Sequence, residues 1–403
     1  TDLTDAVESL QALTVYGSLL DACKSVDENT NENDGAEEKE LSEEATLFDV
    51  NLTDAKPIRV VLIGVGNPLH TLLDKLSNSA LYEKIEILLI FSNANDAVLL
   101  AKAAALDIPV KSHDEMKKDN VDRCQASLKC LHADALFSVN NLKYIRDPIL
   151  ECFPQGCFNL HPGKLPEYGG LHVAQWAIRN GDTESAATLH WMNGGIDEGA
   201  TAYTATVPIN EYDTGLDLLQ KCMKSGVVLV IKCMVDLLLQ KPVPKIIQNE
   251  ALFHCYKTKD AKNPYIAWKL MLQKEVYNFI RAADYGPVEC PTYSPTICFK
   301  ESVLQIKTKD VEMVPFSNEK ASPGEVVGVS REGIFIQCAS NSGTIHIKSG
   351  TSLDASGKKT NVQGENVALT LGVKCGDFLW DTPTYSNALN AYDIHFASLN
   401  AVV

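Results

Sequence analysis

An apolar run at residues 58–64 restricts the fold of this chain more than any other feature. The run is rich in Val, Leu and Ile and ends on a glycine, as expected of a strand that is buried on both faces of a parallel sheet. Similar runs follow at residues 85–91, 108–110 and 133–138, and helical segments lie between them. Strands that alternate with helices predict an α/β fold with an open, mostly parallel, Rossmann-like sheet. Ligands of such sheets bind beyond the carboxyl ends of the strands.

The second half of the chain has a different pattern. A helical region ends near Ala283, and short alternating runs then appear at residues 324–329, 333–337 and 344–348, separated by turn residues. This pattern predicts a small, barrel-like β domain. We therefore divide the chain into an N-terminal amphipathic helix at 1–26, an acidic linker at 27–56, an α/β domain at 57–250, a helical connector at 251–289 and the β domain at 290–403.

Composition narrows the possible partners. A net charge of -16 at pH 7 over 403 residues makes the surface repulsive to phosphate backbones and argues against nucleic acid as a partner. The 12 cysteines are dispersed and form no C-x-x-C pair, so we expect reduced thiols, no metal site and a cytoplasmic protein. The longest apolar stretch, at residues 226–239, contains Lys232 and Asp236. It is too short and too charged for a membrane span, and we expect a buried helix.

A glycine pair after the first strand invites comparison with phosphate-binding loops. Gly64 and Gly66 have the spacing of the first two glycines of a dinucleotide fingerprint, but Leu69 stands where the third glycine belongs. A glycine turn that closes the strand is the better interpretation.

The most informative motif for chemistry lies at residues 158–170. Alternation along a strand places Asn159 and His161 on one face, so that both side chains can approach one ligand. The Pro and Gly residues that follow predict an irregular loop, which is the usual wall of a binding site. Taken alone, the pair is better explained as a structural histidine and a turn-forming asparagine.

Downstream residues change that balance. A helix at 176–180 and a strand at 187–192 lead to a glycine-flanked turn that presents Asp197 and Glu198. The whole arrangement resembles the folate-dependent formyltransferase family over residues 57–250 and through the β domain. The motifs that carry the resemblance are residues 157–166, 175–182, 195–197, 323–327 and 333–336.

The resemblance implies an enzyme that transfers a formyl group from 10-formyltetrahydrofolate to a primary amine. In such a reaction Asn159 stabilises the oxygen of a tetrahedral centre, as a side-chain amide donor can. His161 donates a hydrogen bond or a proton to that oxygen or to the leaving nitrogen, and Asp197 takes the proton of the attacking amine. The family needs no metal.

The resemblance also implies where the folate donor binds. Its pteridine would lie in a cleft walled by the backbone of residues 137–142, which include Phe137, Asn140 and Leu142, and by the turn that contains Gly195. Simple loop packing is an equally good explanation for Asn140 and Leu142.

Two departures from the family pattern concern the acceptor. Many relatives have an arginine in the loop where this chain has residues 167–170, and the usual Asp-Thr-Gly-Asp turn reads Asp-Glu-Gly-Ala at 197–200. The missing cation favours a small amine, an amino sugar or a carrier-bound aminoacyl group over an anionic acceptor. Residues 165–171 and 280–287 resemble formyltransferase-like domains associated with carrier-protein-dependent biosynthesis.

Several alternatives stay open at this point. Methionyl-tRNA is the default acceptor for the two-domain architecture, although the net charge argues against it. A hydrolase that releases formate and a non-catalytic binding module have the same fold. The sequence does not choose an oligomeric state, nor does it give the role of the N-terminal helix and acidic linker.

Overall fold

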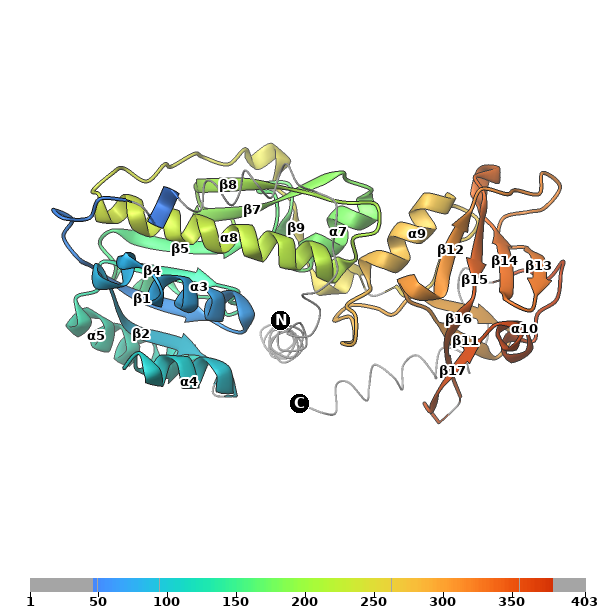
Figure 1. Cartoon of the computed structure of the whole chain (residues 1–403), viewed down its shortest axis with the longest axis horizontal. Helices are drawn as coiled ribbons and strands as arrows, with labels where there is room; N and C mark the ends of the chain where they lie inside the picture. Colours follow the sequence, from blue (N-terminus) through green and yellow to red (C-terminus); the bar gives the residue numbers. More distant parts are fainter. Residues whose placement is uncertain (1–45, 49, 94, 262, 355, 380–403) are drawn as a thin grey trace. The chain divides into compact units, whose positions relative to one another are not determined.

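The computed structural model describes residues 46–48, 50–93, 95–261, 263–354 and 356–379 (Figure 1). The helix predicted at 1–26, and the acidic linker as far as residue 45, lie outside the described residues. Contacts divide the described residues into two compact units: those up to residue 173, with 184–208 and 219–256, form the first, and those at 174–183, 209–218 and from 257 to 379 form the second. The units do not follow a single cut in the sequence, so the domain boundaries given above stay predictions.

The first unit is built on a seven-stranded sheet with the order β3-β2-β1-β4-β5-β7-β8. Strands β1 to β5 are parallel, whereas β7 runs antiparallel to β5, and β8 runs antiparallel to β7. The open, mostly parallel α/β sheet is therefore confirmed. The strands are β1 (Ile58–Gly64), β2 (Ile85–Ser92), β3 (Val110–Ser112), β4 (Ala135–Val139), β5 (Gly156–His161), β7 (Glu184–Trp191) and β8 (Thr201–Pro208).

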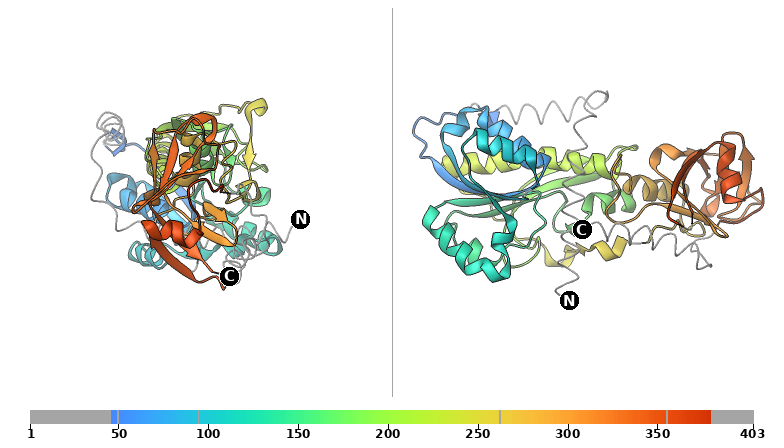
Figure 2. Two further views of the ribbon diagram at one scale, coloured as in Figure 1. Left: turned by 90° about the vertical axis from the view of Figure 1, so that its right-hand side faces the viewer. Right: turned by 90° about the horizontal axis from the view of Figure 1, so that it is seen from below.

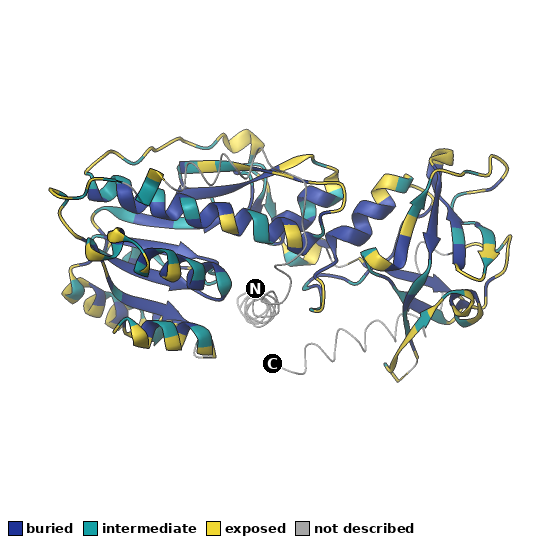
Figure 3. Ribbon diagram, in the orientation of Figure 1, coloured by how far each residue is buried: buried dark blue, intermediate teal, exposed yellow. Residues whose placement is uncertain are grey.

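Helices cover both faces of this sheet, and its strands are largely buried (Figure 3). On one face, Val61 and Ile63 of β1 pack in a cluster with Leu128 of α5. On the other, α8 approaches β5 so closely that a Cβ at Gly226 would lie 2.3 Å from Leu160 Cδ1. The helices of this unit are α3 (Asn67–Ser77), α4 (Ala97–Ala105), α5 (Val121–Leu131), α6 (Asp147–Leu150) and, from residue 219 onward, α8 (Gly215–Leu238), with 3-10 turns at Ala80–Glu83, His113–Met116, Lys118–Asn120 and Glu250–Leu252. Helix α7 (Val173–Asn180) belongs to the second unit from residue 174 onward.

Two predicted elements differ from the structure. The strand expected at residues 108–110 begins only at Val110, because Pro109 has no N–H to donate to the ladder and offers only its carbonyl, which accepts a hydrogen bond from Ile90 N. The buried helix expected at 226–239 is the second part of the longer helix α8. No described helix is long and apolar enough to cross a membrane.

The second unit contains the small β domain (Figure 2). Its strands form two four-stranded antiparallel sheets with the orders β10-β11-β16-β17 and β12-β15-β14-β13. The elements are α9 (Gln273–Ala282), β10 (Thr296–Phe299), β11 (Ser302–Gln305), β12 (Val311–Val314), β13 (Val326–Ser330), β14 (Gly333–Gln337), β15 (Thr344–Ile347), β16 (Ser349–Leu353), β17 (Lys359–Gln363) and α10 (Glu365–Leu371), with 3-10 turns at Thr258–Ala261, Thr308–Asp310 and Ala339–Asn341.

Gly64 ends β1 against the backbone of β4, and we expect Gly64→Ala to destabilise the fold. A Cβ at this position would lie 1.9 Å from the carbonyl oxygen of Val139. Because that atom is backbone in a central strand, the sheet itself must shift, which costs about 1–3 kcal/mol of unfolding free energy. Urea unfolding of the variant measures this loss, and an unchanged midpoint would show that the sheet tolerates the extra methyl group.

Candidate active site

Strand β5 presents Asn159 and His161 at its carboxyl end. Both side chains lie on one face because side chains alternate along a strand, and Pro162 and Gly163 follow directly. His161 is buried and Asn159 is half-buried. The predicted pair is therefore co-facial and lies at the edge of the sheet where ligands bind in folds of this class.

His161 has a partner at each ring nitrogen. Its Nε2 donates to the backbone carbonyl of Tyr168 at 2.6 Å, and its Nδ1 lies 3.4 Å from Oδ2 of Asp197. A carbonyl can only accept, so Nε2 carries a proton. The other ring nitrogen, Nδ1, is consequently the one that faces the carboxylate.

A second histidine, His190 on β7, joins the site, although the sequence did not single it out. It lies directly opposite Asn159 in the antiparallel pairing of β5 with β7. Asn159 Nδ2 donates to His190 Nε2 at 3.1 Å, and His190 Nδ1 donates to the carbonyl of Trp191 at 2.9 Å. Its Nε2 also lies 3.4 Å from Oδ1 of Asp197. One carboxylate therefore faces two imidazoles.

Asp197 occupies the turn between β7 and β8 in a left-handed conformation, with a φ of 57°. Its Oδ2 accepts a hydrogen bond from the N–H of Gly170 at 2.8 Å. Burial alone would raise the pKa of Asp197, but the two facing histidines and the Gly170 N–H outweigh it and hold the pKa well below its ordinary value. The carboxylate is therefore ionised across the physiological pH range.

The residues predicted to wall a folate cleft have different surroundings. The side chain of Phe137 is fully buried and stacks on Phe158, with ring centroids 5.3 Å apart, so only its backbone can border a ligand. Asn140 has a φ of 53°, and its Nδ2 donates to the carbonyl of Val65 at 2.9 Å. Leu142 is half-buried.

Gly195, the remaining predicted wall residue, lies in the turn that contains Asp197. A Cβ at Gly195 would lie 2.2 Å from Oε2 of Glu198. Tyr144 reaches across to this turn, because its hydroxyl donates to the carbonyl of Gly194 at 2.8 Å. The structure therefore brings the loop after β4 next to the turn, as a shared cleft requires.

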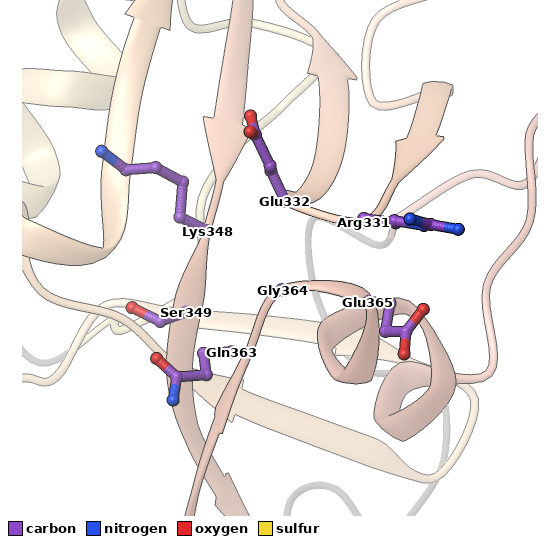
Figure 4. A pocket seen from close by; sticks show the side chains of 7 residues that line it. All are labelled: Arg331, Glu332, Lys348, Ser349, Gln363, Gly364 and Glu365. Carbon is purple, nitrogen blue, oxygen red and sulfur yellow. The ribbon is translucent and has the colours of Figure 1, made fainter.

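The β domain contains an open pocket of about 760 Å³ (Figure 4). Its lining carries charges of both signs, and the side chains of Arg331 and Lys348 extend in opposite directions. Lys348 Nζ lies 3.6 Å from the carboxylate of Glu312. Because its polar groups do not converge on one point, we do not assign a catalytic role to this pocket. The lining residues are Arg331, Glu332, Lys348, Ser349, Gln363, Gly364 and Glu365.

The described parts of the chain contain no evident metal-binding site. No group of three or more His, Cys, Asp or Glu side chains is arranged there to hold a metal ion. The cysteines in those parts form no disulfide with one another.

Comparison with known proteins gives consistent results. Residues 58–234 match the family model described as formyl transferase, and residues 260–363 match the formyl transferase C-terminal domain. A methionyl-tRNA formyltransferase of Synechococcus is 29% identical over 255 residues, which are 61% of this chain and 73% of that protein. The same enzyme of Desulforamulus reducens is 30% identical over 232 residues, or 58% of this chain and 69% of the relative.

A solved structure has the same fold. The N-formyltransferase of Helicobacter canadensis, in complex with folinic acid and dTDP-3-aminofucose, superposes with a TM-score of 0.52 at 21% identity and covers 72% of this chain and 98% of its own.

Proposed function

Because the chain belongs to the formyl transferase family of folate-dependent N-formyltransferases, we propose that Asn159, His161 and Asp197 form its active centre, with His190 as a fourth member. The donor of the family is 10-formyltetrahydrofolate. The observation that carries the proposal is one buried, ionised carboxylate between two histidines, with an amide donor alongside.

The amide of Asn159 is suited to the formyl oxygen. Its nitrogen has two N–H groups, and the bond to His190 uses one of them. The second donates to the oxygen as negative charge gathers there in the tetrahedral centre, and such donors are worth more in a partly buried site than in water. His190 therefore orients the amide, and Asn159 contacts the substrate.

Proton transfer completes the reaction. The amine nitrogen attacks the formyl carbon, the carbonyl electrons move to oxygen, and their return breaks the bond to N10 of the folate. Asp197 takes the proton that the amine loses, directly or through one water. His161 exchanges the Tyr168 carbonyl for the substrate and gives its Nε2 proton to N10, while its Nδ1 takes the amine's proton from Asp197 and so restores the carboxylate.

The donor cleft, in this proposal, lies between the loop after β4 and the turn after β7. The backbone from Phe137 to Leu142, the side chain of Asn140 and the peptide of Gly195 contact the pteridine. The Tyr144 to Gly194 hydrogen bond supports this placement because it joins the two walls.

The acceptor is a primary amine, and methionyl-tRNA is the candidate that the names of the sequence relatives favour. The expectation that the net charge excludes tRNA is therefore not supported by those relatives, which are named for a tRNA acceptor. A small amine, an amino sugar and a carrier-bound aminoacyl group are the other acceptors that the loop at residues 167–170 admits, because it offers no arginine to an anionic substrate. The cytoplasmic location stays a prediction.

An acceptor panel tests this proposal. The purified chain is incubated with 10-formyltetrahydrofolate and, in separate reactions, with methionyl-tRNA, an amino-sugar nucleotide or an aminoacyl carrier protein. Tetrahydrofolate formation that requires one acceptor identifies the transferase and its substrate. If formate is released at the same rate with and without an acceptor, the protein is a hydrolase. If it neither turns over nor binds the folate, it is a non-catalytic binding module.

A further inference from the structure

Residues 246–256 lie between the two regions that the family models match, yet they contact both walls of the proposed active centre. Ile246 forms an antiparallel bridge with Thr201 at the start of β8. Strand β9 (Cys255–Tyr256) then pairs in parallel with β6 (Gly169–Gly170), in the loop that follows β5. We refer to residues 246–256 as the strap.

Gln248 of the strap holds the turn that carries Asp197. Its side-chain Nε2 donates to the carbonyl of Asp197 at 2.7 Å and to the carbonyl of Gly199 at 2.6 Å. Both N–H groups of the amide are thereby used. The left-handed backbone of Asp197 is unfavourable for a residue with a side chain, and it persists only where neighbours fix it.

Packing leaves the turn at residues 197–199 few other conformations in which the Asp197 carboxylate would keep its position. A Cβ at Gly199 would lie 1.7 Å from the carbonyl oxygen of Trp191, so this glycine packs directly against β7. Gln248 donates hydrogen bonds to the carbonyls of Asp197 and Gly199, the residues on either side of Glu198. These two bonds therefore set the direction in which the Asp197 side chain leaves the backbone.

The same strap holds the opposite wall. Gly169 N donates to the carbonyl of His254 at 2.8 Å, and Leu171 N donates to the carbonyl of Tyr256 at 2.9 Å. Between these two contacts, the N–H of Gly170 is left to bond Asp197. The strap consequently fixes the loop on one side of Asp197 and the turn on the other.

We propose that Gln248 is a positioning residue of the formyl-transfer reaction, which acts by holding the Asp197 carboxylate against His161 and His190. The inference rests on the proposed function. It predicts that loss of the two N–H donors lowers kcat on the order of tenfold to 100-fold, the range expected for a displaced catalytic group. We expect the KM for the folate donor to change much less, because Gln248 is not among the residues proposed to line the donor cleft.

Gln248→Met tests this directly, since Met has a similar length and shape but no N–H group. The matched control is Gln125→Met. Gln125 also donates from its amide to a backbone carbonyl, that of Pro148 at 2.8 Å, but it does not bond the Asp197 turn. A fall in kcat in Q248M with normal turnover in Q125M supports the inference, and equal kcat values in both variants overturn it.

Gln248→Glu adds a signature that loss of packing alone does not produce. An ionised carboxylate at this position repels the two carbonyls, whereas a protonated carboxyl group donates to one of them. The activity of Q248E relative to wild type should therefore fall as pH rises through the pKa of the new carboxyl group. A ratio that is independent of pH contradicts the positioning role.

The imidazole NMR signals of His161 and His190 provide a readout that needs no turnover. We expect both to shift in Q248M and to stay unchanged in Q125M, because only the first variant releases the Asp197 carboxylate. If the wild-type chain neither transfers nor hydrolyses the formyl group, the proposed function is wrong, and the NMR comparison still decides the inference. Unchanged imidazole signals in Q248M overturn it.

Discussion

Replacing Asp197 by Asn should lower kcat on the order of 100-fold to 10,000-fold, the contribution of a general acid–base group. The amide keeps the shape of the side chain but cannot take the proton of the attacking amine. It also withdraws the negative charge that lies 3.4 Å from both His161 and His190. Steady-state kinetics with 10-formyltetrahydrofolate and the identified acceptor measure the loss.

Asp134→Asn is the control for this variant. Asp134 also accepts a backbone hydrogen bond, from Arg59 N at 2.7 Å, but it precedes β4 and so lies at the opposite edge of the sheet from the site. We expect D134N to keep its kcat. Comparable kcat losses in D134N and D197N would show that the effect comes from the fold and not from the reaction.

D197N should also change the acid sensitivity of the fold. The pKa of Asp197 is lowered in the folded protein, so the carboxylate contributes stability above its unfolded-state pKa of about 3.9. That contribution is lost as pH falls below this value toward the lower folded-state pKa. The free energy of unfolding should therefore decrease less in D197N than in wild type on acidification below about pH 4.

Replacing Asn159 by Ala should lower kcat on the order of 100-fold or more, the cost of removing one donor to a developing oxyanion. The fold should persist, because Asn159 is only half-buried and its bond to His190 joins side chains at the edge of the sheet. Single-turnover kinetics separate this loss from weaker folate binding. Near-normal turnover of a folded N159A protein would show that Asn159 does not take part in the reaction.

The parts of the site that follow from local rules could be predicted from the sequence. Alternation along β5 placed Asn159 and His161 on one face, and the glycines around Asp197 indicated the turn. His190 could not be found in this way, because its approach depends on β7 running antiparallel to β5. That pairing direction is set by contacts between strands that lie about 30 residues apart, and no residue in either strand encodes it alone.

Long-range packing also explains the differences elsewhere. The family resemblance predicts that the backbone of Phe137 borders the donor cleft, and this stays a prediction; the sequence does not predict that its ring stacks on Phe158 in the interior. Gln248 follows α8 in a segment without regular periodicity, and its position in the sequence gives no sign of its contact with Asp197. A hydrogen bond between a side chain and a distant backbone carbonyl leaves no pattern in one sequence.

The fate of a labelled formyl group shows whether Asn159, His161 and Asp197 form the catalytic centre. The chain is incubated with 10-formyltetrahydrofolate carrying ¹³C in the formyl group together with the acceptor, and NMR follows the label in wild type and in D197N. We expect the label to move into a formamide in wild type and to stay on the folate in D197N over the same time. Equal transfer by both proteins would contradict the assignment of the centre to Asn159, His161 and Asp197.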